Sequence, residues 1–331
     1  MKYFAKSTIS GLIAGLLVTV GVLFAPHDAF AWEPKKPVDF VIMAGKGGGA
    51  DKMARLMQTI IEKHKLATKP FIPINKPGGS GAEALIFLNS AKGINKDHTV
   101  MVTLNSFYTT PLRQPQLQID ISTFTPIGRM AEDSFLLWVH KDSGITNVTE
   151  FVKAAKAKGN NWIMAGTGKG QEDSLLTSFL NSAYGLKMRY VPYKGGGRVA
   201  KELAGKHADS TVNNPSEQLG FYQAGTTRPL AAFTPDRLPL FPDAPTFREL
   251  GKYGMVYFMQ RSVVGAPGMS RGAAKYYQKV FKKVYQTSEW QGYMKKKSLR
   301  GEFLTGKKLK EYWAKEKKNH AKMLKDIGEI K

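Results

Sequence analysis

The 331-residue sequence contains no cysteine. Disulfide scaffolds, iron–sulfur clusters, cysteine-ligated zinc sites and thiol catalysis are therefore excluded, because each requires a sulfur that the chain lacks. Acidic residues are also scarce: 26 Asp and Glu stand against 49 Lys and Arg, which gives a formal net charge of +23. With 42% hydrophobic residues the chain can still bury a substantial core, so disordered and low-complexity classes are excluded. The positive charge leaves three partners open: nucleic acid, a membrane surface or a small anionic ligand.

The first 31 residues have the pattern of a secretory signal peptide. Lys2 and Lys6 precede an apolar run over residues 9–25, and Ala29-Phe30-Ala31 matches the small-x-small pattern of a cleavage site. The run is shorter than the roughly 20 apolar residues of a membrane span, although a retained anchor is the alternative. We expect cleavage after Ala31, export and, for that reason, no nucleic-acid partner.

The sequence offers no clear catalytic or metal-binding motif. Its six histidines are scattered, with no HExxH or HxH spacing. Ser80 lies in a stretch that approaches the GxSxG motif of hydrolases, but Ala82 replaces the last glycine. The pattern Gly45-x-Gly47-x-x-Ala50 matches a dinucleotide fingerprint, yet the second strand ends at Asn75 without the acidic residue that holds a ribose. We predict no catalytic residue, no metal and no cofactor, and we keep an exported hydrolase that uses Ser80 as an alternative.

The first half of the chain contains the order strand, glycine-rich loop, helix. A β-rich run over 38–43 leads into the loop 45–51 and then into an amphipathic helix, for which Asp51 is the predicted N-cap. A second unit follows, with a strand over 71–75, the glycine loop 76–81 and another helix. Strands that alternate with helices predict a mainly parallel sheet, and ligands bind at the carboxyl ends of such strands.

The same order recurs in the second half. A strand over 161–164 leads into the glycine-rich loop 165–173, and Glu172-Asp173 is predicted to cap the helix that follows. Exposed amides at the start of a helix favour anions. Two such loops that face each other across a cleft would therefore suit a small ligand with carboxylate groups.

Several short stretches, which follow one another in a fixed order along the chain, together resemble a known protein family. They are residues 36–51 with Ala54 and Arg55, residues 75–81, 193–197, 203–205, 228–232, 242–246 with Glu249 and Gly251, and residues 265–267. This ordered set resembles the Bug/TctC proteins, the periplasmic solute-binding proteins of tripartite tricarboxylate transporters.

The resemblance implies a two-domain Venus-flytrap fold of the α/β class, in which each domain is a doubly wound, mainly parallel sheet with flanking helices. It implies that residues 32–130 and 255–331 form domain 1 and residues 131–254 form domain 2, with crossings near 129–135 and 253–262. The implied function is capture of a di- or tricarboxylate, aliphatic or aromatic, and its delivery to the membrane subunits of the transporter. A monomer without enzymatic activity is expected. A ligand-sensing subunit of a two-component system is a further alternative.

The resemblance also nominates ligand-binding residues, mostly in the glycine loops and at strand ends. They are Gly45, Lys46, Gly47, Gly48, Gly79, Ser80, Thr103, Asn105, Ser106, Thr167, Gly168, Lys169, Gly170, Gln171, Asn213, Asn214 and Arg261. Lys46, Lys169 and Arg261 depart from the usual family pattern. We expect these three cations to converge on one cleft and to favour an anion with more than one charge. The alternative for each is a surface charge or a hinge salt bridge.

Overall fold

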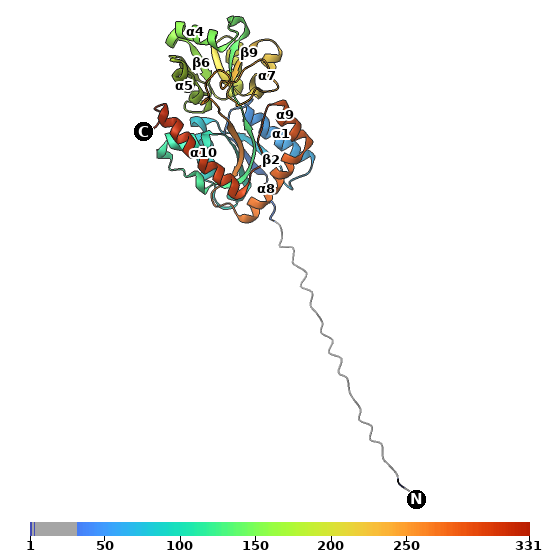
Figure 1. Ribbon diagram of the computed structural model, residues 1–331. Helices are drawn as coiled ribbons and strands as arrows, with labels where there is room; N and C mark the ends of the chain where they lie inside the picture. Colours follow the sequence, from blue (N-terminus) through green and yellow to red (C-terminus); the bar gives the residue numbers. More distant parts are fainter. Residues whose placement is uncertain (2, 4–31) are drawn as a thin grey trace. The chain divides into compact units, whose positions relative to one another are not determined.

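The computed structural model describes residues 1, 3 and 32–331 (Figure 1). The predicted signal peptide lies outside these residues, apart from Met1 and Tyr3. Residues 32–331 form one compact unit. No helix within the described residues combines the length and the apolar character that a bilayer crossing requires.

The unit contains two five-stranded sheets, one in each of two lobes (Figure 1). The first sheet has the order β2 (Phe71–Asn75), β1 (Val38–Ile42), β3 (Thr99–Thr103), β10 (Met259–Gly265) and β4 (Thr125–Asp133). The second has the order β7 (Arg189–Pro192), β6 (Ile163–Gly166), β8 (Ser210–Asn213), β5 (Leu136–His140) and β9 (Thr227–Ala232). We refer to them as the first and the second lobe.

In each sheet four strands run in the same direction and the fifth runs in the opposite direction. In the first lobe β10 is antiparallel to β3 and β4, and in the second lobe β5 is antiparallel to β8 and β9. The chain passes from the first sheet to the second between β4 and β5, and it returns between β9 and β10. The expected fold of two mainly parallel α/β lobes is thus confirmed, whereas the domain boundaries at 130/131 and 254/255 stay a prediction.

Helices cover both sheets. The first lobe has α1 (Gly49–Lys63), α2 (Ala82–Asn89), α3 (Ser106–Arg113), α8 (Arg271–Gln286), α9 (Ser288–Lys296) and α10 (Gly306–Asp326). The second lobe has α4 (Val148–Lys158), α5 (Glu172–Tyr184), α6 (Gly196–Ala204) and α7 (Pro215–Gln223). In helix α1 the apolar residues recur with the 3.6-residue period of a helix and form its buried face: Met53, Met57, Ile60 and Ile61.

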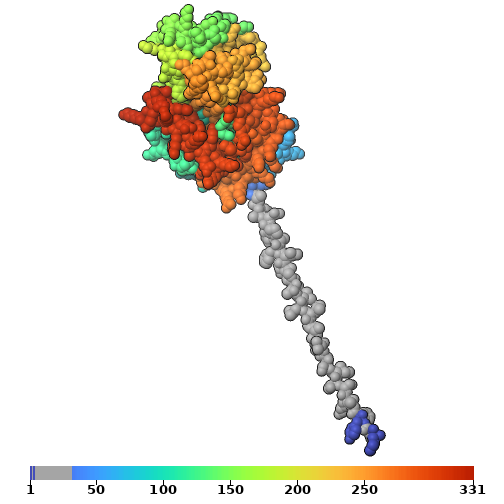
Figure 2. Space-filling model, in the orientation of Figure 1, coloured from blue at the N-terminus to red at the C-terminus, as the bar shows by residue number. Residues whose placement is uncertain are grey.

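The C-terminal helix α10 carries eight lysines against three acidic residues. Its apolar stripe, including Leu309, Trp313 and Leu324, is buried, and all its lysines except the half-buried Lys317 are exposed. Figure 2 shows this red segment on the visible face of the first lobe. The positive charge of this helix is therefore on a solvated surface.

Two local predictions were wrong. Asp51 lies inside α1, where Gly48 is the N-cap residue; its carboxylate instead accepts a hydrogen bond from the Gly47 amide and pairs with Arg55. The loop turns at Gly47, whose φ of 78° is in the left-handed region, so the helix starts earlier than the side-chain pattern suggests. The strand expected over 161–164 begins and ends two residues later, as β6 (Ile163–Gly166), because a 3-10 turn occupies Gly159–Asn161.

Candidate functional site

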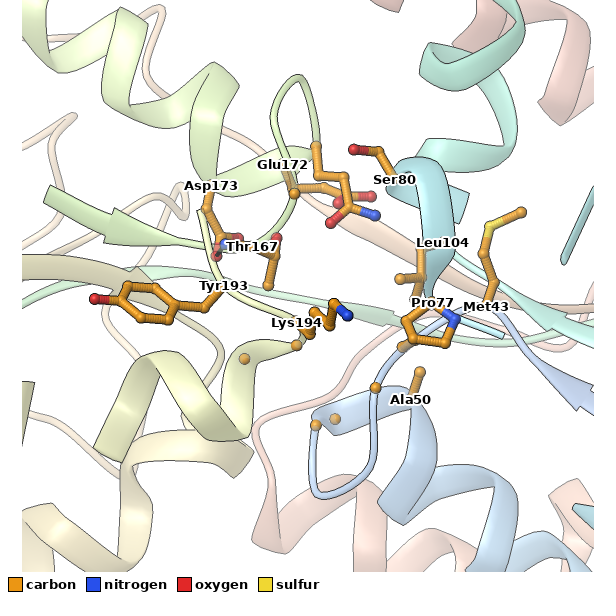
Figure 3. A pocket seen from close by; sticks show the side chains of 18 of the residues that line it. Met43, Ala50, Pro77, Ser80, Leu104, Thr167, Glu172, Asp173, Tyr193 and Lys194 are labelled. Atoms are coloured by element: carbon orange, nitrogen blue, oxygen red, sulfur yellow. Dashed lines mark hydrogen bonds between the residues drawn. The ribbon is translucent and has the colours of Figure 1, made fainter. Parts of the chain in front are cut away.

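A cavity of about 320 Å³ lies between the two lobes and is lined by loops from both (Figure 3). The nominated residues that line it are Gly45, Gly48, Gly79, Ser80, Thr167, Gly168, Lys169, Gln171, Asn214 and Arg261. The nominated residues that do not are Lys46, Gly47, Thr103, Asn105, Ser106, Gly170 and Asn213. The size falls within the range of pockets that hold small molecules.

Glycines allow the backbones of the two lobes to touch beside this cavity. A Cβ atom on Gly45 would lie 2.5 Å from the carbonyl oxygen of Lys194, and one on Gly197 would lie 2.7 Å from that of Gly47. No real Cβ contact to backbone is so short, so any larger residue would push the lobes apart. The loops 45–48 and 194–197 thus require glycine because they approach each other closely.

A second contact between the lobes involves Ser80 and the loop after β6. Ser80 Oγ donates a hydrogen bond to the Lys169 carbonyl over 3.0 Å, and Arg113 Nη1 donates to the same carbonyl over 2.7 Å. Ser80 itself has a φ of 57°, a conformation that is uncommon outside glycine. Its hydroxyl serves as a donor across the cleft.

The Glu217 carboxylate bridges the lobes. Its Oε1 accepts a hydrogen bond from the Gly49 amide at the start of α1, and its Oε2 accepts one from the Asn214 amide at the start of α7. Helix N-termini carry unpaired amides and a partial positive charge, so a carboxylate is stabilised there. The sequence predicted that the N-terminus of α1 would bind a ligand anion. In the structure this N-terminus already contacts the Glu217 carboxylate.

Glu172 and Asp173 have similar roles at other amides. Glu172 accepts a hydrogen bond from the Ser106 amide at the start of α3 in the first lobe, and Asp173 accepts one from the Thr167 amide. Neither was expected to do so, since both were predicted to cap α5, whose N-cap residue Gln171 makes no side-chain cap. Burial raises the pKa of Glu172, and it raises that of Asp173 well above the ordinary value, with a further contribution from the nearby Glu217 charge.

The three nominated cations do not converge as expected. Arg261 lines the cavity but is buried, and its guanidinium is bound by the Asp133 carboxylate and by Asn214 Oδ1 at 3.1 Å. This is the salt bridge weighed as the alternative, at the point where β4 leads toward the second lobe. Lys46 is exposed and does not line the cavity, whereas Lys169 does. Lys194, which was not nominated, joins Lys169 at the cavity.

Of the nominated strand-end residues only Asn214 lines the cavity, and Thr103, Asn105 and Asn213 support the loops beside it. Asn105 Nδ2 donates to the Tyr257 hydroxyl and to the Phe258 carbonyl, both on the segment that returns from the second lobe. Asn213 Nδ2 donates to Glu217 Oε2, which orients that carboxylate. Thr103 Oγ1 donates to the carbonyl of its neighbour Leu104. These side chains hold the lining residues in place.

The functional residues that sequence reasoning missed are mainly acidic. Glu172 and Asp173 were read as local caps, and Glu217 was not considered. The glycines at 195–197 follow β7 as the other glycine loops follow β1 and β6, and this repeated position was the one signal that could have nominated Lys194. The Asn214-x-x-Glu217 spacing is a capping-box signal for the start of α7. Nothing in the sequence indicated that Glu217 also contacts Gly49, which is 168 positions away.

The two α/β lobes, the double crossing and the cavity between them are the architecture of bilobal solute-binding proteins. The family model of the tripartite tricarboxylate transporter family receptor, TctC, matches residues 53–328. The chain therefore belongs to the TctC family. It is similar to a UPF0065 protein from the gbd 5' region of Cupriavidus necator, with 24% identity over 98% of this chain and 97% of that protein.

Solved structures show the same fold. The periplasmic binding protein BugD has a TM-score of 0.84 at 21% identity, over 90% of this chain and 99% of that one. Rpa4515 of R. palustris, solved with adipate, has a TM-score of 0.82 at 22% identity, over 89% and 98% of the two chains. MatC of Rhodopseudomonas palustris, solved with bound malate, has a TM-score of 0.79 at 20% identity, over 88% and 99%. The family and the fold are those of substrate-binding proteins and not of enzymes.

Proposed function

We propose that this protein is exported to the periplasm, captures a small organic carboxylate between its lobes and delivers it to the membrane subunits of a tripartite tricarboxylate transporter. The observation that carries the proposal is the 320 Å³ cavity that glycine-rich loops of both lobes enclose. The adipate and malate in two similar structures support a di- or tricarboxylate ligand. Binding would occur by closure of the lobes about the two crossings between the sheets.

Nominated residues at the cavity would contact the ligand in different ways. The loop that contains Gly79 and Ser80 and the loop that contains Gly168 and Lys169 supply main-chain groups from opposite lobes. The Lys169 ammonium has no ion pair among the described residues, so it is available to a carboxylate. A charge-assisted hydrogen bond contributes about 1.5–3 kcal/mol, so a few of them support micromolar affinity, about −8 kcal/mol.

The capture function is tested by a thermal-shift screen of the purified mature protein against aliphatic and aromatic carboxylates, followed by calorimetric titration of the hits. We expect at least one acid to raise the melting temperature and to bind with one-to-one stoichiometry. If none of them does, the carboxylate proposal is wrong. Neutral amides of the same acids are the matched controls, because they preserve the shape and remove the charge.

Export and delivery require separate experiments. N-terminal sequencing of the periplasmic form should begin at Trp32 if cleavage follows Ala31. Deletion of the coding sequence should abolish uptake of the labelled ligand, and the gene on a plasmid should restore it. Normal uptake together with loss of ligand-induced transcription would instead support the sensing alternative.

A further inference from the structure

Two buried carboxylates at the cavity form no direct ion pair. Glu172 and Asp173 are 3% and 4% exposed, and both line the cavity together with the half-buried Glu217. Among the described residues, no Lys, Arg or His nitrogen lies within 4.0 Å of any of these three carboxylates. Buried acidic groups in proteins are almost always paired. The Arg261 guanidinium, which also lines the cavity, acts to lower the pKa of Glu172, but it is itself paired with Asp133. The inner wall of the cavity therefore carries acidic groups that no Lys, Arg or His of the described residues pairs directly.

Backbone amides near these carboxylates act in favour of the ionised form, although burial is the larger effect and the net pKa of both groups is raised. The Ser106 amide donates to Glu172, and the Thr167 amide donates to Asp173. Both acids also lie in the first turn of α5, where the helix dipole stabilises negative charge. Burial acts in the opposite direction and raises the pKa of both groups. A cation beside them would offset that effect, whereas a second carboxylate would add to it.

The mouth of the same cavity is positively charged. Lys169 and Lys194 line it, both are exposed, and neither has an ion pair within the part of the chain that the structure describes. In Figure 3 the Lys194 side chain extends from the second lobe toward Pro77 of the first, while Glu172 and Asp173 come from the start of α5. A ligand in this cavity thus meets acidic groups at the buried wall and ammonium groups at the exposed side.

We propose that the cavity prefers a carboxylate that also carries a positively charged ammonium group, with the ammonium facing the Glu172–Asp173 pair and the carboxylate facing the two lysines. This inference rests on the proposed function, because it specifies the ligand of the same cavity. A plain diacid would place its second carboxylate against like charges or leave the acidic wall unpaired. An amino-carboxylate satisfies both ends of the cavity.

Matched ligands test the preference on the unmodified protein. Calorimetry at neutral pH would compare adipate with 6-aminohexanoate, which has the same carbon chain and an ammonium in place of one carboxylate, and with 2-aminoadipate, which adds an ammonium. Succinate and aspartate form a shorter pair. We expect at least one ammonium-bearing acid to bind tenfold or more tightly than its diacid. Diacids that bind as tightly or more tightly would overturn this inference and leave the proposed function intact, whereas a lack of any carboxylate binding would overturn both.

Variants locate the preference. Glu172→Gln and Asp173→Asn should weaken binding of the preferred amino-carboxylate at least tenfold and change binding of the matching diacid less than threefold. Asp243→Asn, at an exposed position of the same lobe, is the control and should change neither. Equal losses for both ligands would assign the two acids a structural role and overturn the inference. If circular dichroism shows that a variant does not fold, the comparison of matched ligands on the unmodified protein alone tests the inference.

Discussion

The Gly49 amide donates a hydrogen bond to the Glu217 carboxylate over 3.1 Å, although the two residues are 168 positions apart. The other carboxylate oxygen accepts from the Asn214 amide, as part of a capping box at the start of α7. One side chain thus contacts the N-termini of two helices in different lobes. Glu217 therefore stabilises helix α7 of the second lobe and also holds the two lobes together at the cleft.

Replacement of Glu217 by Gln should lower the free energy of unfolding by about 1–3 kcal/mol, because hydrogen bonds to a charged group contribute about 1.5–3 kcal/mol and a lost cap about 1 kcal/mol. Urea denaturation at pH 7 measures the change. The control is Glu311→Gln on the exposed side of α10, where the pair with Lys307 spans 3.7 Å and is expected to contribute less than about 0.5 kcal/mol. Equal stability of the Glu217 variant and the unmodified protein would contradict the assignment.

Gly45→Ala should hinder closure and weaken ligand binding at least tenfold, because the new Cβ would lie 2.5 Å from the Lys194 carbonyl of the other lobe. The melting temperature without ligand should change little, since each lobe keeps its core. Small-angle scattering with and without ligand, together with calorimetry, would measure both effects. Gly292→Ala is the control, because a Cβ at that helical glycine meets no atom within 4 Å. Unchanged affinity in Gly45→Ala would show that the two backbones need not touch.

Lys169→Ala and Lys194→Ala should each weaken carboxylate binding about tenfold or more, because both ammonium groups belong to the cavity lining and have no ion pair. Lys46→Ala should leave the affinity unchanged within twofold. It is a matched control, since Lys46 is also an exposed lysine in a glycine-rich loop but does not line the cavity. A tenfold loss of affinity with Lys46→Ala, or no loss with the other two variants, would contradict this prediction.

His320 should make the protein less stable as the pH falls from about 6.5 to about 4. The side chain is buried in α10, its Nε2 lies 3.0 Å from the Tyr257 hydroxyl, and burial lowers its pKa from 6.5 to about 4. Between these values the unfolded chain binds a proton that the folded chain does not, so stability is present above the unfolded pKa and is lost as the pH falls. This pKa difference corresponds to a loss of roughly 3 kcal/mol at most in the free energy of unfolding.

Urea denaturation at several pH values from 7.5 to 4.5 tests this contribution. His320→Gln should reduce the loss of stability between pH 6.5 and 4.5 compared with the unmodified protein. His207→Gln, at an exposed histidine, should retain the full loss. An identical pH profile in His320→Gln and the unmodified protein would assign the acid sensitivity to other groups.

Several elements of the fold could be predicted because their signals are local. The strand over 71–75 follows from a short β-rich run beside a glycine-rich loop, and the helix Gly49–Lys63 follows from the 3.6-residue period of its apolar residues. Helix α3 was missed because its sequence includes Pro111 and polar residues, and its burial depends on packing against α10. The reversed strand β10 was missed because its position in the first sheet depends on a return from the second lobe.

The sequence by itself determined the α/β class, the glycine-rich loops at the ends of strands and the absence of any cysteine chemistry, because each depends on neighbouring residues or on composition. Only the tertiary structure decided which charges face the cavity. It moved Arg261 into a buried pair with Asp133 and left Lys46 outside. It also brought Glu172 and Glu217 to the amides of distant helices. The physical reason is that a hydrogen bond acts over about 3 Å in space, whatever the separation of its partners along the chain.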